Sequence, residues 1–260
     1  MKLMDLQKKV IIITGASEGI GKALAKKLAP NNYLILVGRN YEKLNQLIKE
    51  LGSKKHLAVK CDISNPEQIH KAYKTIEQDY SNIDLIINNA GISSAKKFDD
   101  YEDSQIRDII NINVTGSILF TKTFIKKIIL SKGAIVNIGS MFGEIAHPCY
   151  SIYSASKFAI KGFSDSLRRE LSHLGVRVFY ISPRATKTQS LEKNDEIGQY
   201  FKMNVDEPEK VANYIIEGIN NNQPAIYPKS IERLFLFVQK FFTKLIDNNL
   251  SAISKKIYLK

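Results

Sequence analysis

Two side chains that can move a proton, Tyr153 and Lys157, lie four residues apart in the segment YSASK. We predict a helix over 153–174, ended by Gly175, and residues four apart in a helix share a face. A free tyrosine, with a pKa of about 10, is a poor base near neutral pH. A neighbouring ammonium group stabilises the phenolate and lowers that pKa. The pair therefore has the chemistry of a general acid and base that acts on an oxygen atom.

A glycine-rich turn, TGASEGIG at residues 14–21, lies between a β-branched run and a helical pattern. Gly15 permits the tight turn, Gly19 leaves room for a pyrophosphate to approach the backbone, and Gly21 lets helix and strand pack closely. The free N–H groups and the positive end of the following helix attract phosphate. The turn therefore predicts a phosphate-binding site.

Short apolar runs alternate with helical patterns over the whole chain. We predict strands at 9–14, 33–37, 57–59, 83–87, 134–138, 176–181 and 225–227, and helices at 20–29, 41–51, 66–80, 105–130, 153–174 and 208–221. This alternation indicates βαβ units with right-handed crossovers. The expected fold is α/β: a doubly wound (Rossmann), mostly parallel seven-stranded sheet with helices on both faces, forming one domain over 1–230.

Composition excludes several classes of protein. The 260 residues contain two cysteines, Cys61 and Cys149, too few for a disulfide scaffold, and the four histidines show no metal-ligand spacing with them, so no metal site is predicted and the histidines are interpreted as surface or loop residues. The net charge of +12 comes from scattered lysines, so we predict no nucleic-acid partner. No signal peptide and no long apolar run is evident, which predicts a cytoplasmic protein.

Five motifs in order make the chain similar to the short-chain dehydrogenase/reductase family. They are TGxxxGIG at the glycine turn, NNAG at 88–91, Asn113 in NVTG, Ser140 after the strand at 134–138, and YxxxK at 153–157. The resemblance implies that Tyr153 exchanges a proton with a carbonyl or alcohol oxygen, that Ser140 hydrogen-bonds the same oxygen, and that Lys157 and a nicotinamide adjust the tyrosine. It also implies that Asn113 supports a water-linked proton path.

The resemblance further implies a set of residues around a nicotinamide dinucleotide. These are Gly15, Ser17, Gly19, Ile20, Gly21, Arg39, Asp62, Ile63, Asn89, Ala90, Gly91, Tyr153, Lys157, Pro183, Thr186 and Thr188. Asp62 could contact the adenine or serve as a cap for a turn.

The end of the second predicted strand favours NADP(H) over NAD(H). A carboxylate there would bind the ribose hydroxyls of NAD, but this chain has Arg39, whose planar guanidinium can bind a 2′-phosphate. Glu18 argues the other way, because a carboxylate near that phosphate would weaken NADP binding unless it points away.

One departure from the family lies after the sixth predicted strand, where Arg184 replaces a glycine. If the position needs a positive φ, Arg184 is strained. We expect the loop to adapt and the fold to survive. The long segment 186–205 is interpreted as a substrate loop.

The tail, 231–260, is predicted to be an amphipathic helix. Leu234, Val238, Phe241 and Leu245 form one stripe, which Phe235, Phe242 and Ile246 widen. The stripe could pack on its own domain, pair subunits in a homodimer or homotetramer, or lie peripherally on an anionic membrane.

We therefore predict an NADPH-dependent oxidoreductase that reduces a small-molecule carbonyl compound, an aldehyde or ketone of hydrophobic or lipid-like character. The alternatives are an alcohol dehydrogenase that works in the oxidative direction and a non-catalytic, nucleotide-sensing regulator on the same fold.

Overall fold

The fold was analysed in a computed structural model that describes residues 4–52, 55–188, 195–201, 203–228, 236 and 241–259. Its seven strands form one sheet, in which every pair of neighbours is parallel and the order is β3-β2-β1-β4-β5-β6-β7. The predicted fold class is confirmed. The strands are β1 (Val10–Thr14), β2 (Tyr33–Gly38), β3 (Leu57–Lys60), β4 (Leu85–Asn88), β5 (Ala134–Ile138), β6 (Arg177–Ile181) and β7 (Ala225–Ile226).

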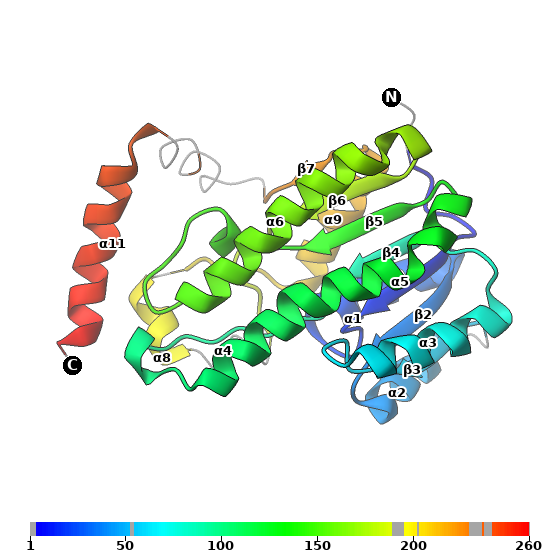
Figure 1. The fold of residues 1–260 in the computed structure, drawn as a ribbon, viewed down its shortest axis with the longest axis horizontal. Coiled ribbons are helices and arrows are strands. Elements are labelled where there is room, and N and C mark those ends of the chain that lie inside the picture. The colour runs from blue at the N-terminus through cyan, green and yellow to red at the C-terminus, as the bar shows by residue number, and fades with distance from the viewer. Residues whose placement is uncertain are drawn as a thin grey trace.

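Helices connect the strands and cover both faces of the sheet (Figure 1). They are α1 (Gly19–Leu28), α2 (Tyr41–Leu51), α3 (Pro66–Asp79), α4 (Asp103–Ile110), α5 (Ser117–Leu130), α6 (Ser151–Leu171), α8 (Asp195–Gly198), α9 (Pro208–Asn220) and α11 (Thr243–Tyr258). Local signals set several of their ends: the Asn40 side chain caps α2, and Gly52 ends that helix with a φ of 69°.

Two hydrophobic cores lie on opposite faces of the sheet, because successive strand residues point to opposite sides. Ile11 and Ile13 of β1 face one core, which α1, α2 and α9 cover. Ile12, between them, faces the other core, which α3, α5 and α6 cover. The continuous apolar strands predicted from the sequence are therefore buried on both faces, as parallel sheets require.

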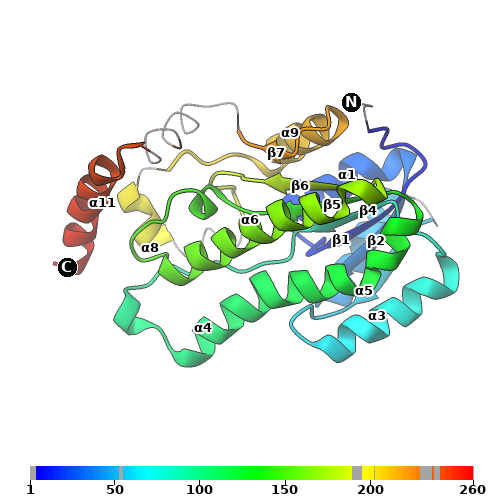
Figure 2. The ribbon, with the colours of Figure 1, turned by 45° about the horizontal axis from the view of Figure 1, so that its top comes forward.

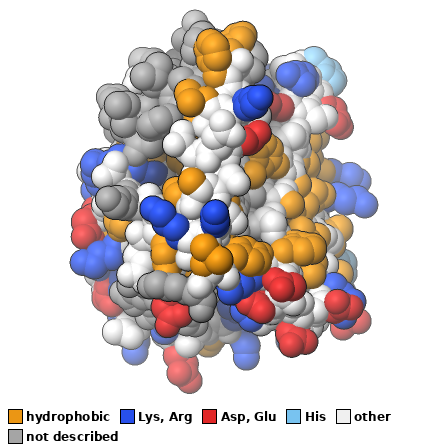
Figure 3. All heavy atoms as spheres, turned by 90° about the vertical axis from the view of Figure 1, so that its left-hand side faces the viewer, with side chains coloured by type: hydrophobic (Ala, Val, Ile, Leu, Met, Phe, Trp, Pro, Cys, Tyr) orange, Lys and Arg blue, Asp and Glu red, His pale blue; other side chains and the backbone are white. Residues whose placement is uncertain are grey.

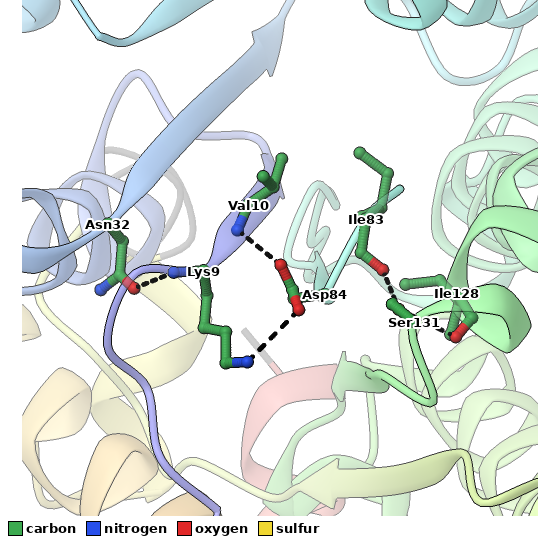
Figure 4. Close-up of polar contacts among 7 residues, drawn as sticks. All are labelled: Lys9, Val10, Asn32, Ile83, Asp84, Ile128 and Ser131. Carbon is green, nitrogen blue, oxygen red and sulfur yellow. Dashed lines mark hydrogen bonds and ion pairs between the residues drawn. The ribbon is translucent and has the colours of Figure 1, made fainter. Parts of the chain in front are cut away.

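A polar cluster closes the edge of the sheet where β1 and β4 begin (Figure 4). The Asp84 carboxylate accepts hydrogen bonds from the Val10 N–H at 2.9 Å and the Lys9 Nζ at 3.4 Å. The Ser131 hydroxyl donates to the carbonyl oxygens of Ile83 and Ile128. These contacts satisfy backbone groups at the N-terminal ends of the strands. The candidate site lies at the other, C-terminal ends.

The predicted helix over 105–130 contains an irregular turn. Between α4 and α5, residues Asn111–Gly116 form a π-helix turn. The two α-helices therefore form one continuous helix that is wider at this turn. Such turns are frequent at functional sites. This one carries Asn113.

The C-terminal helix, α11, stands beyond α8 and away from the sheet (Figures 1 and 2). Of the predicted stripe, Leu234, Phe235 and Val238 lie outside the described residues. Phe241, Phe242 and Leu245 are exposed, whereas Ile246, Leu250 and Ile253 are half-buried and Ile257 is buried. Within the described part of the chain, no helix combines the length and the apolarity needed to cross a bilayer.

Candidate active site

One large pocket, of about 990 Å³, lies at the edge of the sheet where the parallel strands end. Residues within two positions of the ends of β1, β2, β3, β4, β5 and β6 all contribute to its wall, as expected for the ligand crevice of a doubly wound sheet. The predicted residues that line it are Gly15, Ser17, Gly19, Ile20, Arg39, Asp62, Ile63, Asn89, Ala90, Gly91, Ser140, Tyr153, Lys157, Pro183, Thr186 and Thr188. Gly21 and Asn113 lie behind this wall.

The glycine turn between β1 and α1 has the shape that the sequence predicts. Gly15 and Gly19 have φ values of 63° and 54°, in the left-handed region that favours glycine. A Cβ on Gly15 would lie 2.8 Å from the Ala90 Cα, and one on Gly19 would lie 2.8 Å from the Thr188 Cγ2. The backbone is therefore exposed to the pocket at the N-terminus of α1.

Thr14 and Asn89 hold this turn against the end of β4. The Asn89 side-chain amide donates to the carbonyl oxygens of Thr14 and Gly15, each at 3.0 Å. The Thr14 hydroxyl accepts hydrogen bonds from the N–H groups of Asn89 and Ala90 at 3.0 and 3.1 Å. Asn89, predicted to contact a cofactor, thus fixes the glycine turn through the contacts that the structure shows.

Tyr153, Lys157 and Ser140 come together in the middle of the pocket. Tyr153 and Lys157 lie on α6, and the Lys157 Nζ is 5.6 Å from the centre of the Tyr153 ring. This Nζ also donates to the Ile138 carbonyl at the end of β5, at 3.0 Å. Ser140, two residues further on, is hydrogen-bonded to Tyr153. The spacing predicted from the sequence therefore produces a proton donor, a second hydroxyl and an amine at one place.

Burial dominates the protonation of this group. It raises the pKa of Tyr153 to about 12, although the hydrogen bond with Ser140 acts in the opposite direction. It also lowers the pKa of Lys157 to about 8. The expectation that the lysine lowers the tyrosine pKa is therefore not met in the protein alone, because removal from water disfavours both charged forms at once.

Asn113 is buried beneath the pocket wall. Its side-chain oxygen accepts a hydrogen bond from the Ile92 N–H at 2.8 Å, and its amide donates to the Ile92 carbonyl at 2.8 Å and to the Ser156 hydroxyl at 3.0 Å. A Cβ on Gly91 would lie 3.1 Å from the Asn113 oxygen and 3.7 Å from the Lys157 Nζ. The described contacts brace the chain after β4 directly behind Lys157.

A basic group surrounds Arg39 at the end of β2. Lys43, one helical turn further on, lies 3.5 Å from the Glu18 carboxylate and lines the same pocket. Arg39 and Lys60 also share a second, shallower hollow beside it. Lys43 was not among the residues predicted for the site, and this lysine offsets the charge of Glu18.

Asp62 lines the pocket and also caps a turn. Its carboxylate accepts hydrogen bonds from the Ser64 N–H at 2.9 Å and the Ser64 hydroxyl at 2.7 Å. The two interpretations left open for Asp62 are therefore compatible in this structure.

Arg184 binds a buried carboxylate. Its guanidinium donates to Asp206 at 2.7 and 2.9 Å, and the Asp206 side chain is only 3% exposed. Arg184 is not among the described residues with a positive φ, so the strain considered for this position is absent. The loop has adapted as expected, and Thr186 and Thr188 remain on the pocket wall.

Aromatic side chains form the part of the pocket beyond Tyr153. Phe142 packs against Tyr153 and Tyr150, with ring centres 5.9 and 4.6 Å apart, and Phe201 packs against Tyr150 and His147. His147 and His56 lie in loops, as predicted, but neither is a plain surface residue. His147 lines the pocket, and His56 is buried and accepts a hydrogen bond from the Leu34 N–H.

The doubly wound sheet and this pocket, in which Ser140, Tyr153 and Lys157 meet, belong to an oxidoreductase. The family model for short chain dehydrogenase matches residues 9–197, and the chain belongs to this family. It is 35% identical to carbonyl reductase family member 4 of Xenopus laevis over 213 residues, which are 80% of this chain and 89% of that protein.

Two solved structures share the fold closely. A short-chain dehydrogenase/reductase from Burkholderia phymatum in complex with NAD aligns with a TM-score of 0.85 at 20% identity, over 94% of this chain and 96% of that one. A short-chain dehydrogenase from Burkholderia cenocepacia in complex with NADP aligns with a TM-score of 0.82 at 21% identity, over 95% and 99%. Their different dinucleotides leave the choice of cofactor to the residues of this chain.

Proposed function

We propose that this protein is an NADPH-dependent reductase of a hydrophobic aldehyde or ketone. The observation that carries the proposal is the meeting of Tyr153, Ser140 and Lys157 in one pocket with the glycine turn. Burial raises the pKa of Tyr153 to about 12, so its hydroxyl is protonated at neutral pH. A protonated tyrosine is the form that donates to a carbonyl oxygen, whereas oxidation of an alcohol would need the phenolate. The similarity to a carbonyl reductase agrees with this direction.

The residues present fit a nicotinamide dinucleotide. Gly15 and Gly19 of the glycine turn line the pocket at the start of α1, where a helix N-terminus favours phosphate. A Cβ at either position would collide with Ala90 or Thr188, so only glycine permits this close packing of the turn. Lys157 would hold the nicotinamide ribose, and Arg39 with Lys43 would hold the 2′-phosphate. When bound, the nicotinamide supplies the hydride for the carbonyl carbon. Ser140 would orient the carbonyl oxygen, and Tyr153 would give it a proton.

A direct assay tests this function. The purified full-length protein, mixed with NADPH and a panel of aldehydes and ketones, should consume NADPH with at least one of them and form the matching alcohol. The oxidative alternative predicts faster turnover with NADP+ and alcohols at the same pH. A regulator would bind NADPH, seen as enhanced fluorescence of the nucleotide, and turn over no compound in either direction.

Arg39→Ala should weaken NADPH binding about tenfold to a hundredfold, because a charge-assisted hydrogen bond to the 2′-phosphate contributes ~1.5–3 kcal/mol. Dissociation constants from fluorescence titration measure this. NADH is the matched control, since it lacks only that phosphate, and its affinity should change less than twofold. Equal losses for both nucleotides, or a parent enzyme that prefers NADH, would show that Arg39 has another role.

Assembly and location stay predictions. We propose a homo-oligomer, a dimer or tetramer, in the cytoplasm. Gel filtration of the full chain with light scattering should therefore give a mass of at least two chains.

A further inference from the structure

The pocket has two parts with different chemistry. The part around the glycine turn, which we call the cofactor part, contains Glu18, Arg39, Lys43 and Asp62. The part beyond Tyr153, which we call the aromatic part, is lined by Phe142, Tyr150 and Phe201 together with His147, whose pKa is lowered by burial. Among the described residues that line the pocket, Lys157 and Arg184 are the charged side chains outside the cofactor part, and Arg184 is paired with Asp206.

The aromatic part forms a cluster between Tyr153 and the C-terminal helix. The ring centres of Phe142 and Tyr150 lie 5.9 and 6.5 Å from that of Tyr153, and Phe201 packs on the far side, 6.0 Å from Tyr150. Phe201 ends the short 3-10 turn Gln199–Phe201, which contacts α11. A compound whose carbonyl lies at Tyr153 and whose far end reaches α11 must therefore be elongated.

The side of α11 that faces the domain forms the far wall of the aromatic part. Ile246, Asn249 and Leu250 line the same pocket as Tyr153. The helix is held at its other end, where Ile257 is buried and the Tyr258 hydroxyl accepts a hydrogen bond from the Phe98 N–H at 3.3 Å. The outer side of this region is exposed, with hydrophobic side chains and lysines interspersed on that face of the molecule (Figure 3). Leu245, beside Ile246 on α11, is 57% exposed and is not among the residues that line the pocket.

We propose that α11 is the far wall of the substrate pocket and that Ile246 and Leu250 bind the apolar tail of an elongated, uncharged carbonyl compound, such as a medium-chain aldehyde. A charged tail would lose its hydration against these side chains without gaining a counter-ion. An apolar tail gains about fourfold in binding for each methylene that it buries there. The inference rests on the proposed reductase function for the position of the carbonyl.

Binding of decanol tests the wall without turnover. Calorimetric titration of the full-length protein, saturated with NADPH, should show decanol binding with a negative heat-capacity change. Leu250→Ala should weaken this binding about tenfold, because it removes most of an apolar contact. Leu245→Ala is the matched control, since it makes the same change on the exposed side of the same helix and should leave the affinity within twofold.

A second variant and a kinetic measurement guard against an indirect effect of the truncated side chain. Leu250→Trp keeps an apolar side chain but occupies the space for the tail of the ligand, so it should also weaken the binding of decanol. In both Leu250 variants, the ratio of kcat/KM for decanal to that for propanal should fall about tenfold, whereas Leu245→Ala should preserve it.

Equal decanol affinity in the parent, Leu250 and Leu245 proteins would overturn the proposal, and so would an unchanged decanal-to-propanal ratio. If decanol binds as expected but no aldehyde is reduced, the role of α11 as a wall of the pocket is supported and the proposed reductase function is wrong. If aldehydes are reduced without any effect of Leu250, the function stands and the wall fails.

Discussion

Tyr153→Phe should lower kcat by about a hundredfold to ten-thousandfold, the range over which a positioned general acid accelerates a reaction. The substitution removes the phenolic proton but keeps the ring that packs edge-on against Phe142, with centres 5.9 Å apart. NADPH affinity should therefore change little, because the glycine turn and Arg39 are untouched. Steady-state kinetics with a carbonyl substrate and nucleotide titration measure the two quantities.

Tyr73→Phe is the matched control for this experiment. It removes the same hydroxyl from a tyrosine on α3. The Tyr73 ring packs on Phe124 and is not among the residues that line the pocket. This variant should keep the parent kcat within about twofold. A Tyr153→Phe enzyme with parental turnover would remove Tyr153 from the mechanism, and Ser140 would become the next candidate for the proton donor.

Asp206→Asn should lower the free energy of unfolding at pH 7 by about 3 kcal/mol, the low end of the range for breaking a buried ion pair. The Asp206 carboxylate, 3% exposed, faces Arg184 and also Lys210, whose Nζ lies 2.8 Å away. Without its charge, two cations face each other beside a buried amide. Urea unfolding measures the loss. Lys210→Met should cost below about 1 kcal/mol, because the lysine side chain is 64% exposed.

The Asp206 effect should depend on pH in one direction. Its pKa is held below the usual value, first by the hydrogen bonds from Arg184 and further by Lys210. The stabilisation is therefore complete above the ordinary aspartate pKa of about 4 and is lost as the pH falls through the lowered pKa of the folded state. The parent and Asp206→Asn should converge in stability below about pH 4. A difference that stays constant there would exclude the carboxylate charge as its cause.

Local patterns were sufficient to predict most of the scaffold. Runs such as Val10–Thr14 are β-branched without polar alternation, and only a strand buried on both faces suits them. The glycine turn and the Tyr153–Lys157 spacing were predictable because each depends on residues that are close in sequence.

Properties that depend on burial by distant segments of the chain were not predictable from the sequence. The pKa of Tyr153 is set by how completely other elements remove it from water, and no motif contains that information. Lys43 acquires its position by pairing with Glu18 from another βα unit. In α11, Leu245 belongs to the predicted stripe and Leu250 does not, yet Leu250 lines the pocket and Leu245 is exposed, because the approach of the helix to the turn at 199–201 determines which side is covered.

The π-helix turn at Asn111–Gly116 separates Asn113, which belongs to the candidate site, from the residues of α5 that pack on the core. A π turn contains one residue more than an α turn, so removing one residue from this segment would leave an ordinary helix rather than a misaligned one. Phe120 and Phe124 of α5 would still face the sheet, and only the placement of Asn113 would change. The wide turn thus sets the position of Asn113 independently of the residues by which α5 packs on the core.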